Sequence, residues 1–306
     1  MAGSVIRASG LVKRFGRGRD AKTALDGLDL SVDEGEVYGY LGPNGAGKTT
    51  TIRLMLDLIR PSAGEIRVFG ASPRDNADTR RRIGYLPGDF VVNPRLTGRE
   101  LLSYLGALRG GVPVARIDEL AQRFDLDLTR RIGSLSKGNR QKVGLVQAFM
   151  HRPPLLVLDE PSSGLDPFLQ QRFIELVRDA SVNGQTVFMS SHVLSEVQAT
   201  CHRVGIIRDG RLVTVANVDE LREQAQRRIE LTIAGPVTAT EFEALPELRN
   251  VTVSAGPGGT VLRALLAGSP DGLVKTAARY EVVGLRAEEP ELEELFFTFY
   301  DRESRP

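Results

Sequence analysis

A glycine-rich loop between an apolar run and a helical pattern constrains this chain more than any other feature. Residues 37–51 read VYGYLGPNGAGKTTT, and Gly42 to Thr49 fit the pattern G-x-x-x-x-G-K-[ST] at every fixed position. The apolar run predicts a buried strand, and Ile52 to Ile59 predict a helix. Glycines let backbone N–H groups turn toward an anion, and the helix N-terminus adds its positive dipole end. We therefore predict a phosphate-binding loop in which Lys48 holds the outer phosphates and the Thr49 hydroxyl ligates Mg²⁺.

Length, charge and cysteine content limit the classes of protein this chain can be. Its 306 residues are enough for two modest domains, each with its own core. Its 40 basic and 39 acidic side chains leave a formal charge of +1, so no global field draws it to nucleic acid or to an anionic membrane. We find no signal-peptide pattern and no apolar run near the roughly 20 residues that span a bilayer, so we expect a soluble, cytosolic chain. Cys201 is the only cysteine, which excludes an internal disulfide and a multi-cysteine metal site.

Strand patterns flank the loop on its N-terminal side. A short strand is predicted from Val5 to Leu11, and another from Leu28 to Val32. The second turns at 33–35 into the strand of the loop, which predicts a hairpin between the two. Phe15 follows the first strand, and its aromatic ring suits either stacking on an adenine base or packing against the first sheet.

The middle of the chain is mainly helical in pattern. Prolines interrupt residues 79–152 at several points, and the spacing of Thr97 and Glu100 is that of a capping box at a helix start. Strand signals return only at Leu155. We therefore predict a helical subdomain, inserted over about residues 88–152.

Inside this insert, a polar segment precedes an apolar-periodic helix. The segment reads LSKGN, from Leu135 to Asn139. Ser136 and Gly138 can offer a hydroxyl and free N–H groups to an anion, or they can simply cap the helix. By itself the segment favours a plain helix cap.

Two acidic residues end an apolar strand pattern, which runs from Leu155 through Asp159 to Glu160. Ligands sit at the C-terminal ends of such buried parallel strands. Asp159 can therefore reach Mg²⁺ beside the phosphate loop, and Glu160 can polarise a water that attacks the terminal phosphate. A later strand pattern, 186–190, is followed by His192, which can sense a γ-phosphate by hydrogen bonding or can merely start a helix.

The order GPNGAGKTT, LSKGN, LLVLDEP, SGLD and SSH resembles the nucleotide-binding subunit of ATP-binding cassette (ABC) transporters, across nearly all of residues 5–216. The resemblance implies an α/β fold: a P-loop ATPase core with a mixed sheet and a helical subdomain. It also implies a head-to-tail dimer, which we expect to be a homodimer, that holds ATP and Mg²⁺ between one phosphate loop and the LSKGN segment of the other copy. An integral membrane permease is the implied partner, and no nucleic acid is expected. The chain would lie at the cytoplasmic face of the cell membrane through that permease.

The resemblance assigns roles to individual residues. Glu160 corresponds to the catalytic base, His192 to the γ-phosphate switch, and Thr49 with Asp159 to the Mg²⁺ ligands. The nucleotide-contacting positions are Phe15, Gly42, Pro43, Asn44, Gly45, Ala46, Gly47, Lys48, Thr49, Thr50, Ser136, Gly138 and Asp166.

Two departures from the family pattern stand out. Lys137 and Asn139 replace a glycine and a glutamine of the usual LSGGQ signature. Gly88 stands where the family has a glutamine that joins the Mg²⁺ shell and links the ATP site to the permease. Asp89, one residue later, is a hypothetical substitute oxygen ligand.

The C-terminal quarter has a different pattern. A charged linker over 217–228 precedes a β-α-β-β-α-β order with a terminal helix at 291–300, which predicts a ferredoxin-like α+β domain over 229–306. The ending PELEELFFTFY resembles C-terminal extensions of bacterial drug-exporter ATPases. We therefore expect an ATPase that powers export of a drug, antibiotic or lipid-like substrate by a separate permease.

Two other functions stay open on the sequence. A soluble ABC ATPase acting on ribosomes or DNA is disfavoured because the chain has one phosphate loop and no sustained heptads. A degraded cassette that only binds nucleotide is disfavoured by Glu160, although Gly88 keeps it open.

Overall fold

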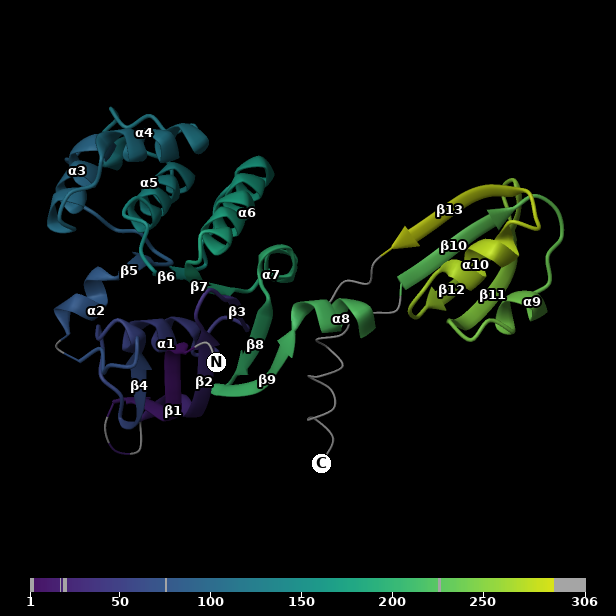
Figure 1. Ribbon diagram of the computed structural model, residues 1–306, viewed down its shortest axis with the longest axis horizontal. Coiled ribbons are helices and arrows are strands. Elements are labelled where there is room, and N and C mark those ends of the chain that lie inside the picture. Colours follow the sequence, from purple (N-terminus) through teal and green to yellow (C-terminus); the bar gives the residue numbers. More distant parts are fainter. Residues whose placement is uncertain (1–2, 17, 19–20, 75, 225–226, 289–306) are drawn as a thin grey trace. The chain divides into compact units, whose positions relative to one another are not determined.

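The computed structural model describes residues 3–16, 18, 21–74, 76–224 and 227–288. The chain divides into two compact units after Ala216. Each unit is described by itself (Figure 1).

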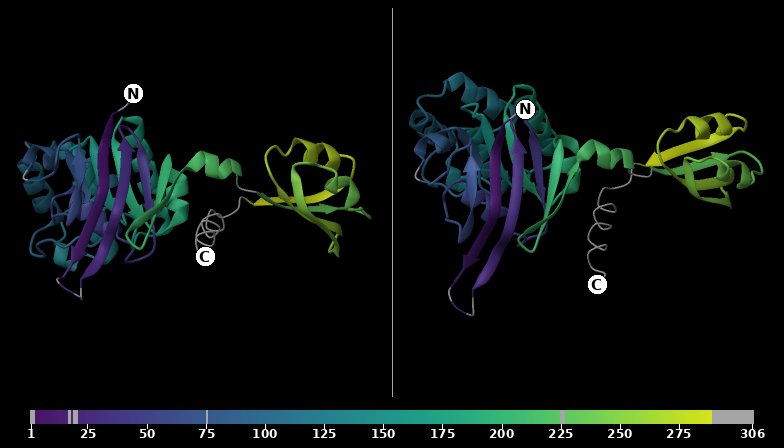
Figure 2. Two further views of the ribbon diagram at one scale, coloured as in Figure 1. Left: turned by 90° about the horizontal axis from the view of Figure 1, so that it is seen from below. Right: turned by 60° about the horizontal axis from the view of Figure 1, so that its bottom comes forward.

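The first unit begins with an antiparallel three-stranded sheet in the order β2-β1-β4. Its strands are β1 (Ser4–Phe15), β2 (Lys22–Asp33) and β4 (Ala63–Val68). The long strands β1 and β2, in purple, run side by side in Figure 2. The predicted hairpin between β2 and the strand of the loop is wrong, because β2 pairs with β1 and the loop strand belongs to another sheet. The turn signal at 33–35 marks a crossing between sheets.

The second sheet holds the strand of the phosphate loop at its centre. Its six strands have the order β5-β6-β7-β3-β8-β9, and β5, β6, β7, β3 and β8 pair in parallel. Every residue of β3, β6 and β7 is buried, as expected for central strands covered on both faces. The strands are β5 (Ile83–Leu86), β6 (Leu155–Asp159), β7 (Thr186–Ser191), β3 (Val37–Leu41), β8 (Arg203–Arg208) and β9 (Arg211–Asn217).

Strand β5 corrects the expectation that strand signals are missing between 79 and 152. Four residues, IGYL, are too short for a clear alternation pattern, and their pairing with β6 supplies what the local sequence lacks. Strands β8 and β9 follow each other in the chain and are neighbours at the edge of this sheet. Asp209 and Gly210 between them have φ values of 49° and 76°, which suits a two-residue turn.

Helices α3, α4 and α5 lie together beyond the β5 end of this sheet in Figure 1. The capping box at Thr97 and Glu100 is confirmed, with both reciprocal hydrogen bonds present at the start of α3. Helix α1 begins at Lys48, four residues earlier than the apolar pattern alone predicts. The bounds are α1 (Lys48–Met55), α2 (Ala77–Arg81), α3 (Gly98–Leu108), α4 (Val114–Arg123), α5 (Lys137–Phe149), α6 (Pro167–Val182), α7 (Leu194–Thr200), α8 (Val218–Gln224) and a 3₁₀ turn (Ile132–Ser134).

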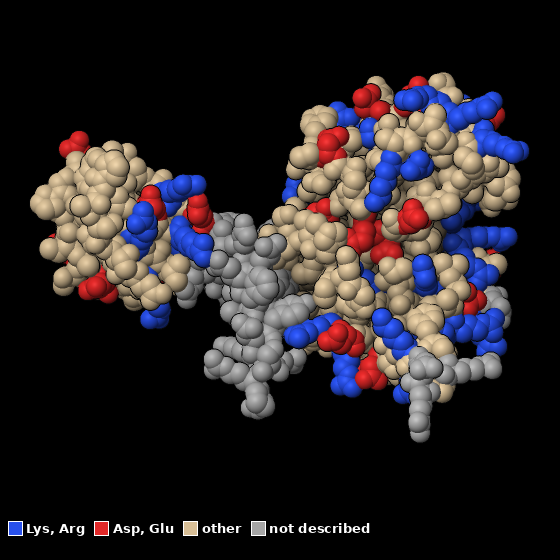
Figure 3. All heavy atoms as spheres, turned by 180° about the vertical axis from the view of Figure 1, so that it is seen from behind, with Lys and Arg blue, Asp and Glu red and all other residues tan. Residues whose placement is uncertain are grey.

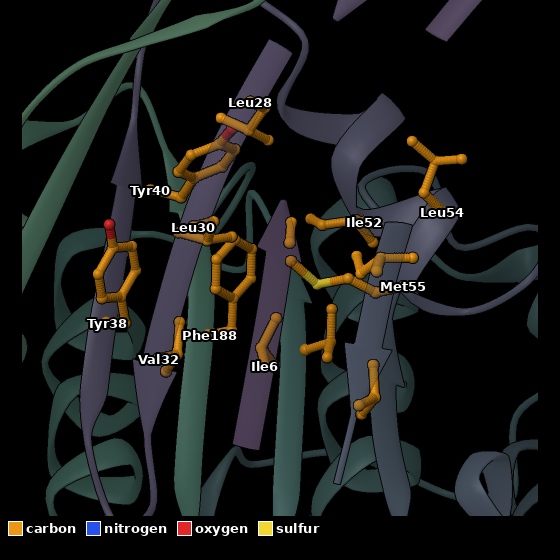
Figure 4. Packing of buried hydrophobic residues seen from close by; sticks show 14 of the residues in the cluster. Ile6, Leu28, Leu30, Val32, Tyr38, Tyr40, Ile52, Leu54, Met55 and Phe188 are labelled. Carbon is orange, nitrogen blue, oxygen red and sulfur yellow. The ribbon is translucent and has the colours of Figure 1, made fainter. Parts of the chain in front are cut away.

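The main hydrophobic core of this unit lies between its two sheets and packs around α1 (Figure 4). The ring of Phe188 on β7 lies 5.2 Å from that of Tyr40 and 5.9 Å from that of Tyr38, both on β3. Burying such a ring fully stabilises the fold by about 2–3 kcal/mol. The core therefore fixes β3 and β7, and with them the loops at their C-terminal ends. Labelled members are Ile6, Leu28, Leu30, Val32, Tyr38, Tyr40, Ile52, Leu54, Met55 and Phe188.

The second unit forms an antiparallel sheet in the order β11-β12-β10-β13, with the ferredoxin-like sequence β-α-β-β-α-β. Its core includes Ile229, Leu231, Phe242 and Leu262. The predicted terminal helix at 291–300 lies outside the described residues. The elements are β10 (Arg227–Ile233), α9 (Thr240–Glu243), β11 (Leu248–Gly256), β12 (Gly259–Leu266), α10 (Asp271–Ala277) and β13 (Val282–Glu288).

In the part of the chain that the structure describes, no helix combines the length and apolar character needed to cross a bilayer. Positive and negative side chains are interspersed over the face drawn in Figure 3, in line with the balanced composition.

Candidate nucleotide-binding site

The predicted phosphate loop joins β3 to α1, and its backbone explains its glycines. A Cβ at Gly42 would lie 2.4 Å from the Ile207 carbonyl oxygen, so the loop can leave β3 only with glycine there. Gly47 caps α1 with a φ of 114°, and a Cβ there would lie 2.8 Å from the Ala24 carbonyl oxygen. Between these two tightly packed positions, Pro43, Asn44 and Gly45 are exposed. The loop therefore presents its middle to solvent, where an anion can reach it.

Lys48 is the first residue of α1, and its side chain turns back across the loop. It is 6% exposed. Its ammonium group donates to the carbonyl oxygens of Gly42 and Pro43 and lies 3.2 Å from Oε1 of Glu160. The charge of Lys48 is thus held at the mouth of the loop, between backbone dipoles and a carboxylate. It stands where an incoming phosphate would replace Glu160 as the anionic partner.

Thr49 and Asp159 come together although 110 residues separate them. The Thr49 hydroxyl donates to Oδ2 of Asp159 at 2.9 Å, and the Ser190 hydroxyl donates to Oδ1 at 2.6 Å. Asp159 ends β6 and is 2% exposed. A hydroxyl and a carboxylate are the oxygen ligands that Mg²⁺ prefers, so the pair fits this ion. No cluster of three or more His, Cys, Asp or Glu side chains suited to a metal occurs within the described ranges.

Gly88 lies against the same carboxylate. A Cβ at position 88 would stand 3.5 Å from Oδ2 of Asp159, in ordinary van der Waals contact. The position where the family has glutamine therefore borders the predicted Mg²⁺ site, but it carries no ligand of its own. Asp89 is exposed, and no described contact joins it to Asp159. Its proposed role as a substitute ligand stays a prediction.

Glu160 occupies a strained position directly after β6. Its φ of 51° lies in the left-handed region, where a residue other than glycine needs support from its surroundings. That support comes from Ser190, whose carbonyl and hydroxyl oxygens accept from the Glu160 N–H at 3.2 and 3.1 Å. The strained backbone conformation of Glu160 therefore sets the direction in which its carboxylate points.

The carboxylate of Glu160 lies between two groups of opposite character. A hydrogen bond of 2.5 Å joins Oε2 to Nδ1 of His192, and Oε1 faces Lys48. Oε1 is buried and has no hydrogen bond within the described residues. An acceptor oxygen of this kind can take a hydrogen bond, and then a proton, from a water molecule. The structure thus brings Lys48, Thr49, Asp159, Glu160 and His192 together as the sequence predicts.

Phe15 is 43% exposed at the end of β1, and the Lys13 ammonium lies 5.0 Å from its ring centroid. A ring buried against the first sheet would not show this exposure. The observation favours base stacking as the role of Phe15, and that role stays a prediction.

Ser136, Gly138 and Asp166 form a separate group. The Ser136 hydroxyl accepts from the Asn139 N–H at 3.2 Å, and the Asp166 carboxylate accepts from the Leu169 N–H at 3.0 Å, so both cap helices. A Cβ at Gly138 would lie 2.7 Å from the Gly164 carbonyl oxygen. No described contact joins these residues to the phosphate loop of their own chain.

Two residues of the site were missed in the sequence. Ser190 supports both Asp159 and Glu160, and its signal was the first serine of the SSH motif. Gln141 is 3% exposed, and its amide donates to the Pro161 carbonyl oxygen at 3.1 Å, which ties α5 to the segment after Glu160. A buried glutamine on a helix face gives no local signal for such a contact.

Comparison with known proteins gives a consistent result. The family model described as "ABC transporter" matches residues 25–163. The chain is 35% identical over 260 residues to the bacitracin transport ATP-binding protein BcrA of Enterococcus faecalis, covering 82% of each chain. It is 36% identical over 311 residues to the daunorubicin resistance ATP-binding protein DrrA3 of Streptomyces coeruleorubidus, covering 97% of this chain and 96% of that protein.

Another relative is similar over nearly the whole length of this chain, and a solved structure is similar in fold. The linearmycin resistance ATP-binding protein LnrL of Bacillus subtilis is 31% identical over 320 aligned positions, which cover 98% of this chain and all of that protein. A solved structure titled "Structure of ATP binding subunit of ABC transporter" aligns with a TM-score of 0.64 at 32% identity, covering 71% of this chain and 92% of that one.

Proposed function

Because the chain belongs to the ATP-binding subunits of ABC transporters, we propose that it hydrolyses ATP at the Lys48–Glu160 site to power export by a separate membrane permease. The observation that carries this proposal is the placement of Glu160. Its backbone N–H donates to Ser190, while its carboxylate is bonded to His192 through Oε2 and lies beside the phosphate-loop lysine through Oε1.

The geometry suggests how the site works on ATP. The phosphates of ATP would lie along the loop, and Lys48 would turn its ammonium from Oε1 of Glu160 to the outer phosphates. This movement frees Oε1 to accept a hydrogen bond from the attacking water. His192 keeps the carboxylate in place through Oε2 and can reach toward the γ-phosphate because it is 54% exposed.

Mg²⁺ would be held by the Thr49 hydroxyl and the Asp159 carboxylate, and when bound it neutralises charge on the phosphate oxygens. Ser190 prepares this site in advance, since its hydroxyl fixes one Asp159 oxygen and leaves the other directed at Thr49. Placement and charge neutralisation are the main contributions a protein makes to phosphoryl transfer.

ABC ATP-binding subunits dimerise and work with a membrane permease. We propose that the second subunit here is a copy of this chain. Ser136 and Gly138 make no described contact with their own phosphate loop, whereas the N-terminus of α5 carries a hydroxyl and free N–H groups suited to a phosphate. A head-to-tail pair would bring them to the ATP of the other copy.

The cargo class is proposed from the relatives. Proteins similar to this chain are named for bacitracin transport and for linearmycin and daunorubicin resistance. We therefore place the chain at the cytoplasmic face of the cell membrane, bound to a permease that exports a drug, antibiotic or lipid-like molecule. By family analogy the permease contacts the region of residues 88–105.

ATP turnover by the purified chain tests the assignment of the site. Glu160→Gln removes the base but keeps the shape, so we expect the rate to fall by about 10²-fold or more while ATP still binds. The matched control is Glu175→Gln, which removes a carboxylate that is 52% exposed on α6. Equal rates in the Glu160→Gln and Glu175→Gln proteins would contradict the proposal.

A further inference from the structure

A buried glutamate outside the nucleotide site lies between two loops of that site, the one that carries Glu160 and the one that carries His192. Glu196 lies on α7 and is 5% exposed. Its Oε2 accepts a hydrogen bond of 3.1 Å from the Ser191 hydroxyl, and a hydrogen bond from the Ser162 side chain lowers the pKa of its carboxyl. Both serines are buried, at 1% and 6% exposure. A carboxylate this deep in the protein is costly unless its hydrogen bonds are satisfied, so its position needs an explanation.

The positions of the two serines supply that explanation. Ser162 is two residues beyond Glu160, on the segment that leads to Asp166, and its carbonyl oxygen accepts from the Leu165 N–H at 2.9 Å. Ser191 ends β7 and directly precedes His192. Glu196 therefore joins the chain just after the catalytic carboxylate to the chain just before the histidine that holds it.

Ser191 also organises the backbone around His192. Its hydroxyl oxygen accepts from the Val193 N–H at 2.9 Å, and its proton has two acceptors within reach, the Val193 carbonyl at 3.2 Å and Glu196 Oε2 at 3.1 Å. One hydroxyl proton cannot serve both acceptors fully. The acceptor-only carboxylate at position 196 competes with the Val193 carbonyl for that proton, and so it acts on the turn that carries His192.

We propose that Glu196 is a positioning residue for ATP hydrolysis, which keeps Glu160 and His192 in register by bonding Ser162 and Ser191 at once. The inference rests on the proposed catalytic role of Glu160. It assigns Glu196 no contact with ATP or Mg²⁺. Its effect falls on the chemical step, because misplacing a reacting group by a small distance slows the reaction more than it weakens binding.

The groups around Glu196 shift the pKa of its carboxyl in opposite directions. Burial raises the pKa of Glu196, while the bonds from Ser162 and Ser191 lower it. The charge of Glu160 raises the pKa further and that of His192 lowers it, while burial and then the Glu196 charge raise the pKa of the Cys201 thiol. The carboxyl of Glu196 is therefore close enough to both catalytic groups to interact with them electrically.

Steady-state ATP kinetics of the full-length protein test this role. Glu196→Gln keeps the shape of the side chain but replaces one of its two acceptor oxygens with an NH₂ donor. Because two serine hydroxyls donate to this side chain, at least one of them must reorient. We expect kcat to fall by about threefold to tenfold in Glu196→Gln and by about ten- to a hundredfold in Glu196→Ala, with the KM for ATP changed by less than about twofold. Ser195→Ala, an exposed position on the same helix, is the matched control and should match the wild type.

A double-mutant cycle separates positioning from general destabilisation. Ser191→Ala should lower kcat by itself, and adding it to Glu196→Gln should have little further effect because both changes remove the same bond. Additive losses, an unchanged kcat in Glu196→Gln, or a KM that rises as kcat falls would each overturn the proposal. Where Glu196→Ala does not fold, Glu196→Gln and the cycle decide.

Different results would contradict the proposed function itself. If wild-type protein hydrolyses no ATP, or Glu160→Gln retains full activity, the catalytic assignment of Glu160 is wrong. If those controls behave as expected and only the Glu196 variants keep wild-type kcat, the positioning role alone is wrong.

Discussion

Removing the Ser190 hydroxyl should damage both stability and metal use, by amounts that the structure allows us to estimate. The hydroxyl donates at 2.6 Å to Asp159, a carboxylate that is only 2% exposed. Ser190→Ala leaves Oδ1 of this buried anion without its donor, at a cost of about 2–3 kcal/mol. In this variant the Glu160 N–H still donates to the Ser190 carbonyl oxygen at 3.2 Å, so its lost hydrogen bond to the Ser190 hydroxyl adds little to the cost in stability.

These values translate into two measurements. For a unit of this size, about 2–3 kcal/mol corresponds to a fall in Tm of roughly 4–12 °C. Because Ser190 orients an oxygen of the Mg²⁺ site, we expect the half-saturating Mg²⁺ concentration for ATP hydrolysis to rise by about 10- to 100-fold, as is typical when the partner of a metal ligand is removed. Thermal unfolding and Mg²⁺ titration of ATPase activity measure the two effects.

Thr186→Val is the matched control, since it also removes a buried hydroxyl from β7. The Thr186 hydroxyl oxygen accepts from the Gly35 N–H at 2.9 Å at the other end of the strand, and Thr186 is 1% exposed. This variant should lose stability but keep the Mg²⁺ requirement of the wild type. The reasoning is refuted if Ser190→Ala keeps that requirement too, or if Thr186→Val raises it equally.

Three further predictions concern other parts of the first unit. Gly47→Ala forces a Cβ to within 2.8 Å of the Ala24 carbonyl oxygen at a φ of 114°, so ATP binding measured by calorimetry should be lost; retained affinity would contradict the loop geometry. Burial, and then the charge of Arg109, lower the pKa of His151 from 6.5 to about 4. Between these pH values the unfolded chain binds more protons at His151 than the folded chain does, so the free energy of unfolding should decrease as the pH is lowered from about 6.5 to 4. After discounting for partial exposure the effect is about 1–2 kcal/mol, and in denaturant titrations His151→Gln should lack it. Asp89→Ala should raise the Mg²⁺ requirement; unchanged ATPase activity and Mg²⁺ dependence would remove Asp89 as a ligand.

The phosphate loop and the two acidic residues at the end of β6, Asp159 and Glu160, could be located from the sequence because their chemistry is local. A glycine pattern encodes a backbone path, and an apolar run ending in carboxylates encodes a buried strand with polar groups at its end. The parallel sheet then brings Thr49 and Asp159 within 2.9 Å, as the two local patterns together imply.

The contacts that refine the site could not be found in this way. Glu160 needs Ser190 for its strained backbone, and Gln141 holds the next segment, but both contacts depend on how strands and helices far apart in sequence are packed. The same limit explains the errors in the fold. Strand β5 exists through its pairing with β6, and a turn signal at 33–35 cannot say whether the next strand returns to the same sheet.

The most direct test of the central claim is a pull-down from native membranes with tagged Glu160→Gln protein, which should hold ATP without hydrolysing it, followed by mass spectrometry of the retained proteins. Lys48→Ala, which lacks the phosphate-binding ammonium, is the matched control. The account predicts an integral membrane permease that is retained with Glu160→Gln in the presence of ATP and reduced with Lys48→Ala. Recovery of ribosomes or DNA-repair proteins, with no membrane partner, would contradict it.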